Sequence, residues 1–176
     1  AAFVERNDRR LFAQTELFRR TYYEETTLPW WRALRLMMPT ANLATGTAEW
    51  WKNGRFWGWE GVGCCHGTCT HVWNYAQGEA RLFPELARSA RLMQDLSSAF
   101  DPRTGRVAFR GEVEGGSPYA ADGQAGTVLK CYREHLTSPD DSFLRAAFPR
   151  AKLALEYLIG KDAEMPRKGG GAEEPD

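Results

Sequence analysis

One carboxylate in this sequence lies in a setting suited to catalysis. Glu60 stands between Trp59 and Gly61, directly after an aromatic-rich stretch over residues 50–59. An aromatic wall can exclude water from a bound ligand, and a glycine lets the backbone approach that ligand closely. A surface glutamate, or one that pairs with Arg55, explains the same pattern, and the pattern alone favours this simpler explanation.

Five potential metal ligands follow within eight residues, in the run Cys64-Cys65-His66-Gly67-Thr68-Cys69-Thr70-His71. Structural zinc sites usually take ligand pairs from two separated segments of the chain. The sequence offers only Cys131 and His135 as a distant pair, on one face of a predicted helix. We therefore expect no metal and no other cofactor, with the small cysteines packing a tight loop. The imidazoles of His66 and His71 can donate hydrogen bonds to hydroxyl groups.

Asp122 and Asn74 are further polar candidates. Asp122 lies in the run Ala120-Ala121-Asp122-Gly123-Gln124, in a loop ahead of a predicted helix, and N-capping alone explains an Asp there. Asn74 lies near the start of another predicted helix and can bind hydroxyl groups. The sequence contains no phosphate-binding loop, dinucleotide fingerprint or GxSxG elbow, so those chemistries are not indicated.

Charge and hydropathy argue against two classes of partner. The chain has 23 basic and 23 acidic residues, whereas binding to nucleic acid or to an anionic membrane requires a basic excess. No run approaches the roughly 18 apolar residues that a membrane-spanning helix needs. The start of the chain lacks the order of a signal peptide, and the cysteines do not form the pattern of a secreted disulfide framework. We therefore expect a cytoplasmic protein.

Helical spacing of apolar residues dominates the chain and predicts an all-α domain over residues 1–162, followed by a disordered tail over 163–176. Asn53-Gly54, between two aromatic arms, predicts a short β-hairpin. Thr68 or Thr70 is a plausible N-cap, and Ser138 with Asp141 resembles a capping box. Glycine-rich loops separate the helices. The predicted helices are 5–25, 30–38, one after residue 70, one from Pro84 through Met93, 124–136 and 140–159.

Several of these runs together resemble the catalytic region of glycoside hydrolase family 116, which includes β-glucosidases and the non-lysosomal glucosylceramidase. The resemblance implies an (α/α)6 barrel, of the six-hairpin glycosidase type, and a retaining mechanism with two carboxylates. It places the nucleophile at Glu60 and a sugar subsite at Thr70, His71 and Asn74, while Trp59, His66 and Asp122 are further candidate sugar contacts. The matching runs are 42–45, 54–61, 69–75, 82–86, 120–124, 132–135 and 140–157.

The sequence departs from this family in two respects. Animal-type members carry an Asp where this chain has His71, and a His where it has Ala121, which favours a bacterial branch with its own substrate. The family's acid/base Asp is expected downstream of Asp176, and a complete barrel needs more helices than 176 residues provide. We therefore expect a partial barrel that acts on a carbohydrate, lacks the remainder of its catalytic domain and is inactive in isolation.

Two alternatives stay open at this point. The same partial fold could bind carbohydrate, or act as a scaffold, without turnover. The cysteine- and histidine-rich run over residues 64–71 could instead form a small metal-binding module.

Overall fold

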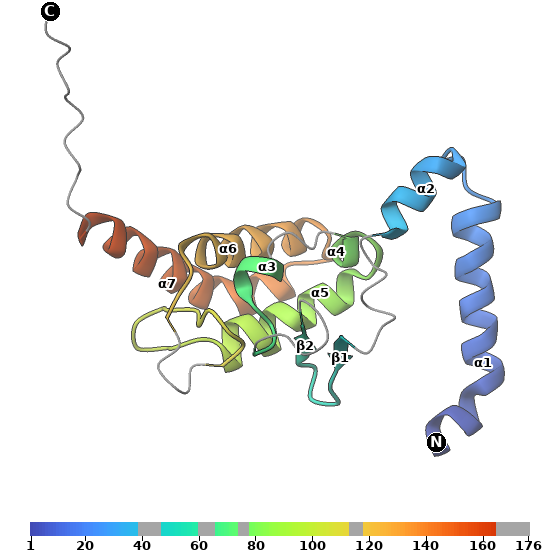
Figure 1. The fold of residues 1–176 in the computed structure, drawn as a ribbon, viewed down its shortest axis with the longest axis horizontal. Helices are drawn as coiled ribbons and strands as arrows, with labels where there is room; N and C mark the ends of the chain where they lie inside the picture. The colour runs from blue at the N-terminus through green and yellow to red at the C-terminus, as the bar shows by residue number, and fades with distance from the viewer. Residues whose placement is uncertain (39–46, 60–65, 74–77, 113–117, 165–176) are drawn as a thin grey trace, which may run out of the picture. The chain divides into compact units, whose positions relative to one another are not determined.

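A computed structural model describes residues 1–38, 47–59, 66–73, 78–112 and 118–164 (Figure 1). The described chain is mainly helical with one two-stranded sheet, which confirms the predicted predominance of helices. It forms two compact units, Ala1–Ala41 and Asn42–Asp176, and each is described by itself. The single domain over 1–162 stays a prediction. Among the described helices, none has the length and apolar character required to cross a bilayer.

The first unit consists of two helical segments separated by a proline. Helix α1 (Ala2–Arg19) continues into the π-helical turn η1 (Arg20–Glu24), and α2 (Trp30–Met37) begins after Pro29, which occupies its N-cap position. Proline fixes φ and disfavours a helical conformation for the residue before it, so the chain turns here. The Tyr22 hydroxyl donates to the Ala33 carbonyl at 3.2 Å and joins the two segments. Both predicted helices are confirmed.

The second unit carries the remaining helices. These are α3 (Thr70–Trp73), α4 (Gly78–Leu82), α5 (Pro84–Ala90), the π-helical continuation η3 (Arg91–Ser98), α6 (Ala121–Leu136) and α7 (Ser142–Glu164). Pro84 lies in the first turn of α5, where a missing N–H costs no hydrogen bond. Helices α6 and α7 lie side by side as an antiparallel pair, with α5 and η3 packed across them (Figure 1).

A buried core joins η3, α6 and α7 to the extended segment after η3. Gln124, which is 1% exposed, connects these parts through its amide. Its Nε2 donates to the carbonyls of Gly105 and Ala154 at 2.8 and 2.9 Å, and its Oε1 accepts from the Val107 N–H at 2.7 Å. The apolar members are Leu96, Ala99, Phe100, Val107, Ala108, Cys131, Phe143, Ala147, Ala151 and Ala154.

The predicted hairpin is confirmed, with a different turn. Strand β1 (Ala48–Trp50) pairs antiparallel with β2 (Phe56–Gly58), in a register that places Trp50 opposite Phe56. Gly54 has a φ of 85°, whereas Asn53 keeps a negative φ and accepts the Arg55 N–H on its side-chain oxygen at 3.1 Å. Five residues thus separate the strands, with one left-handed glycine at the end of the turn.

The predicted helix caps are wrong. Trp73 N–H donates to the Cys69 carbonyl at 2.9 Å, so Cys69 precedes α3, while the hydroxyls of Thr68 and Thr70 are directed to other carbonyls. Ser138 donates to the Glu134 carbonyl at 2.8 Å and so finishes α6. These hydroxyls find carbonyl acceptors in the fold, which competes with capping.

Candidate functional site

Trp57, on β2, is the centre of an aromatic cluster that surrounds the exit of the hairpin. It is 7% exposed. Trp51 stacks on it with ring centroids 5.7 Å apart, and Trp59 contacts it edge-to-face at 6.2 Å. His66 contacts it edge-to-face at 4.9 Å. Two candidate sugar contacts, half-buried Trp59 and exposed His66, therefore lie against one buried ring.

Two glycines make room for this ring. A Cβ at Gly67 would lie 2.4 Å from Trp57 Nε1, and one at Gly111 would lie 2.7 Å from Trp57 Cζ3. Both distances are far below an ordinary van der Waals contact, so only glycine fits without displacing the indole. The two predicted glycine-rich loops thus have a packing role at their described ends.

Arg55 attaches the aromatic cluster to the helices, a role that the sequence analysis missed. Its guanidinium carbon lies 4.9 Å from the ring centroid of Trp51 and 5.5 Å from that of Trp57. Its Nε–H donates to Gln94 Oε1 at 2.9 Å, and its Nη2 donates to Glu112 Oε1 at 3.0 Å. Gln94 is fully buried on η3. The signal available in the sequence was Gln94 itself, a polar residue at a helix position that the fold buries.

Thr70, His71 and Asp122 meet at the junction of α3 and α6. His71 Nδ1 is paired with Asp122 Oδ2, and both side chains are nearly half exposed. Thr70 is buried and packs against Gly123, where a Cβ would lie 2.3 Å from its hydroxyl oxygen. The close approach of α3 to α6 therefore brings together residues that are 51 positions apart.

Asp122 does not cap its helix. Ala120 occupies the N-cap position and Asp122 lies in the first turn of α6, so the loop position and the N-cap interpretation are both wrong. A carboxylate in a first turn is favourable to the helix dipole, and this one also orients an imidazole. When the Nδ1–H of His71 donates a hydrogen bond to Asp122 Oδ2, the ring is held in one tautomer. Such a pair offers carboxylate and imidazole groups to the hydroxyls of a ligand.

The hairpin exit and α3 are fixed to one another through Gly58. Its carbonyl accepts the Thr68 N–H at 2.6 Å and the Trp73 Nε1–H at 3.4 Å. A Cβ at Gly58 would lie 2.2 Å from Trp73 Cζ2. The strand that leads to Trp59 and the helix that carries His71 therefore form one packed assembly.

Four candidate site residues or metal ligands lie outside the described part of the chain. These are Glu60, Cys64, Cys65 and Asn74. Within the described ranges, no three His, Cys, Asp or Glu side chains converge on a point that could hold a metal. Cys69 is buried. The absence of a metal or cofactor at residues 64–71 stays a prediction.

A buried charged cluster between η3 and α6 was not predicted. Arg91 bonds Asp95 one turn along η3, and its Nε lies 3.6 Å from Glu134 Oε2. Lys130 Nζ lies 3.7 Å from Asp95 Oδ2. Burial, together with Arg91, lowers the pKa of Lys130 well below its ordinary value. Opposite charges four residues apart on a helix, such as Arg91 and Asp95, usually lie on a solvated face. This spacing therefore gave no indication that the pair is buried.

Comparison with known protein families found no match, and comparison with the curated proteins found none either.

Proposed function

We propose that this chain is part of the catalytic domain of a retaining glycoside hydrolase that acts on β-glucosides or related glycosides. The pairing of His71 with Asp122 is the observation that carries the proposal. Each residue lies in a separate run that resembles glycoside hydrolase family 116. If the resemblance of these two distant runs were due to chance, their side chains would have no reason to meet in the fold. Their contact therefore supports the proposal.

The chemistry of the assembly suits a sugar. Carboxylates and imidazoles can each bind ring hydroxyls, and an indole face packs on the C–H face of a pyranose. His71 and Asp122 supply the polar groups at an exposed position, and Trp59 supplies an indole. The packing through Gly58 holds these groups in place before a ligand arrives, which lowers the entropic cost of binding.

In this proposal Glu60 is the nucleophile. Its carboxylate attacks the anomeric carbon while the glycosidic bond breaks, and the leaving oxygen departs with the bonding electrons. A second carboxylate, about 5 Å away in retaining enzymes, protonates that oxygen and later activates water. We propose that this acid/base residue, and the remaining helices of an (α/α)6 barrel, belong to sequence beyond residue 176.

Substrates with different leaving groups test the proposal. Natural glucosides need protonation of the leaving oxygen, which general acid catalysis accelerates by roughly 10² to 10⁴. We expect this chain to show no measurable hydrolysis of cellobiose. A 2-fluoro glucoside with a dinitrophenolate leaving group needs no acid, so intact-protein mass spectrometry should show one added fluoroglucosyl group that persists.

Matched variants complete this test. Glu60→Gln should abolish labelling, because an amide cannot form the glycosyl ester. Glu85→Gln, an exposed position on α5, should label as the unaltered chain does. Sugar binding by the chain without any label, even when a downstream segment that supplies the acid/base residue is added, would favour a carbohydrate-binding role without turnover.

A further inference from the structure

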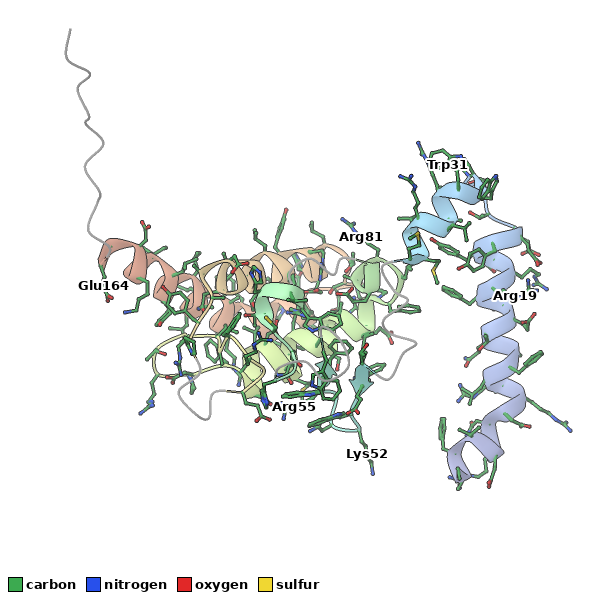
Figure 2. All side chains as sticks on the ribbon, in the orientation of Figure 1. Arg19, Trp31, Lys52, Arg55, Arg81 and Glu164 are labelled. Carbon is green, nitrogen blue, oxygen red and sulfur yellow. The ribbon has the colours of Figure 1, made fainter. Side chains whose placement is uncertain are left out.

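Trp51 is an exposed indole that the fold holds rigidly. It follows β1 at the start of the hairpin turn and is 38% exposed. Its backbone N–H donates to the Arg55 carbonyl at 2.8 Å, and its indole Nε1–H donates to Glu49 Oε2 at 2.8 Å. Stacking on Trp57 fixes the ring plane. Figure 2 labels Lys52 and Arg55, which belong to the same hairpin turn as Trp51.

One face of this indole is covered and the other is open. Trp57 and the Arg55 guanidinium lie 5.7 and 4.9 Å from the Trp51 centroid, and only 5.5 Å from each other. Two groups that close together cannot sit over opposite faces of the ring. Both therefore cover the same face of Trp51, and the exposed area belongs to its other face and edge.

Polar residues lie close to Trp51 in the chain. Glu49, Lys52 and Asn53, each within two positions of it, are all exposed. Glu49 holds the indole N–H through one carboxylate oxygen, so its carboxylate stands beside the ring. A flat apolar face with a polar edge is complementary to a pyranose, which has C–H groups on its face and hydroxyls at its rim.

We propose that the outward face of Trp51 is a stacking subsite for a pyranose ring of a β-linked glucan, with Glu49 accepting hydrogen bonds from the sugar hydroxyls. The subsite rests on the proposed function for the class of ligand only, since it requires neither Glu60 nor turnover. Its indole is already immobilised by three contacts, so binding costs little side-chain entropy.

Tryptophan-selective ¹⁵N NMR of this chain tests the subsite, with cellotetraose as the probe. The indole N–H signal of Trp51 should shift saturably, with a dissociation constant on the order of 1 mM. Trp51→Phe assigns the signal and keeps an aromatic ring against Trp57; in this and the following variant binding is followed through the Trp57 indole N–H signal, and Trp51→Phe should weaken it several-fold. Trp51→Ala should weaken it at least about tenfold, which corresponds to about 1.4 kcal/mol. Glu49→Gln keeps an oxygen that can accept the indole N–H and should weaken binding of cellotetraose.

The matched control is Trp50→Ala, because Trp50 is more exposed, at 58%, and precedes Trp51 by one residue. Successive side chains of a strand point to opposite faces, so this variant should bind cellotetraose as the unaltered chain does. The inference would be overturned if the Trp51 signal of the unaltered chain showed no saturable shift. It would also be overturned if the Trp51→Phe and Glu49→Gln variants bound cellotetraose as tightly as the unaltered chain does. Weaker binding of cellotetraose by Trp51→Ala with intact labelling at Glu60 would separate this subsite from the catalytic proposal.

Discussion

Arg55 combines two kinds of contact that a lysine cannot reproduce. Its planar guanidinium lies over two indoles while separate N–H groups bond Gln94 and Glu112. A lysine keeps the charge and loses the planar fork, and hydrogen bonds to charged groups contribute about 1.5 to 3 kcal/mol. The side chain is mostly buried, so water cannot replace the missing donors.

We therefore expect Arg55→Lys to lower the free energy of unfolding by about 2 kcal/mol, as measured by urea denaturation. The near-ultraviolet circular dichroism of the stacked indoles should also weaken. Arg103→Lys is the control, because the side chain of Arg103 is 89% exposed, and its change should stay within about 0.5 kcal/mol. Equal stability of the two variants would contradict the assigned role of Arg55.

Lys130 gives the fold a specific dependence on pH. Burial, and then the nearby Arg91, lowers the pKa of its ammonium group in the folded chain. The unfolded chain therefore binds this proton more tightly, and the folded state gains stability as pH rises from the lowered pKa toward 10.5. Burial raises the pKa of the Cys131 thiol from 9.0 to about 11, so Cys131 acts in the opposite direction above pH 9.0.

Lys130→Met should flatten the rise of unfolding free energy with pH in the window below pH 9.0, where the Cys131 thiol does not yet contribute. Urea denaturation at several pH values within this window measures the slope, and Lys152→Met, at an exposed position on α7, is the control. Asp95 keeps Arg91 as a partner in the Lys130 variant, so the fold should persist. An unchanged slope would show that Lys130 keeps its ordinary pKa in the folded chain.

At the scale of the elements, Gly105 shows how a turn fits against a helix. It has a φ of 83°, and a Cβ there would lie 2.2 Å from the Leu153 carbonyl oxygen on α7. A backbone atom cannot move aside as a flexible side chain can. Gly160, also on α7, has nothing within 4 Å of its Cβ position.

These two glycines make a matched pair for substitution by alanine. Gly105→Ala should destabilise the chain by more than about 2 kcal/mol, because it adds both strain and overlap. Gly160→Ala should stabilise it by about 0.5 to 1 kcal/mol, because alanine costs less conformational entropy in a helix. Thermal unfolding monitored by circular dichroism compares them. A tolerated Gly105→Ala would mean that the turn does not pack on α7 as described.

The elements were predictable from local signals, while their contacts were not. Apolar spacing and prolines gave the positions of the long helices, and the Asn53-Gly54 pair marked the hairpin. The Thr70 cap failed because its hydroxyl bonds the Phe109 carbonyl, which only the fold brings near. The Ser138 cap failed because its hydroxyl bonds the Glu134 carbonyl four residues earlier and ends α6 instead of starting α7. The resemblance pointed separately to the runs that contain His71 and Asp122, but their pairing depends on how α3 packs against α6, which no local pattern encodes.

At the scale of the whole molecule, α6 exposes an apolar ridge. Leu129, Tyr132 and Leu136, spaced along one side of this helix, are 68%, 63% and 64% exposed. Contiguous apolar surfaces of this kind usually mark contacts with another protein or domain. The ridge agrees with the proposal that further helices of a barrel cover this part of the chain.

We expect the isolated chain to self-associate through this ridge. Sedimentation velocity should show a weight-average mass that rises between about 5 and 100 μM, because exposed apolar area drives association. Joint replacement of Leu129 and Leu136 by glutamine should reduce that rise, and Arg145→Gln, at an exposed position on α7, should not. A monomer across this range would contradict the view that the ridge needs a covering partner.

The proposed activity depends on one residue, and locating the label on the chain tests it most directly. After reaction with the dinitrophenyl 2-fluoro glucoside, proteolysis and tandem mass spectrometry identify the modified carboxylate. We predict a single fluoroglucosyl ester on Glu60, in the peptide that follows Trp59. An ester on another carboxylate, or undiminished labelling of the Glu60→Gln variant, would contradict the assignment of Glu60 as the nucleophile.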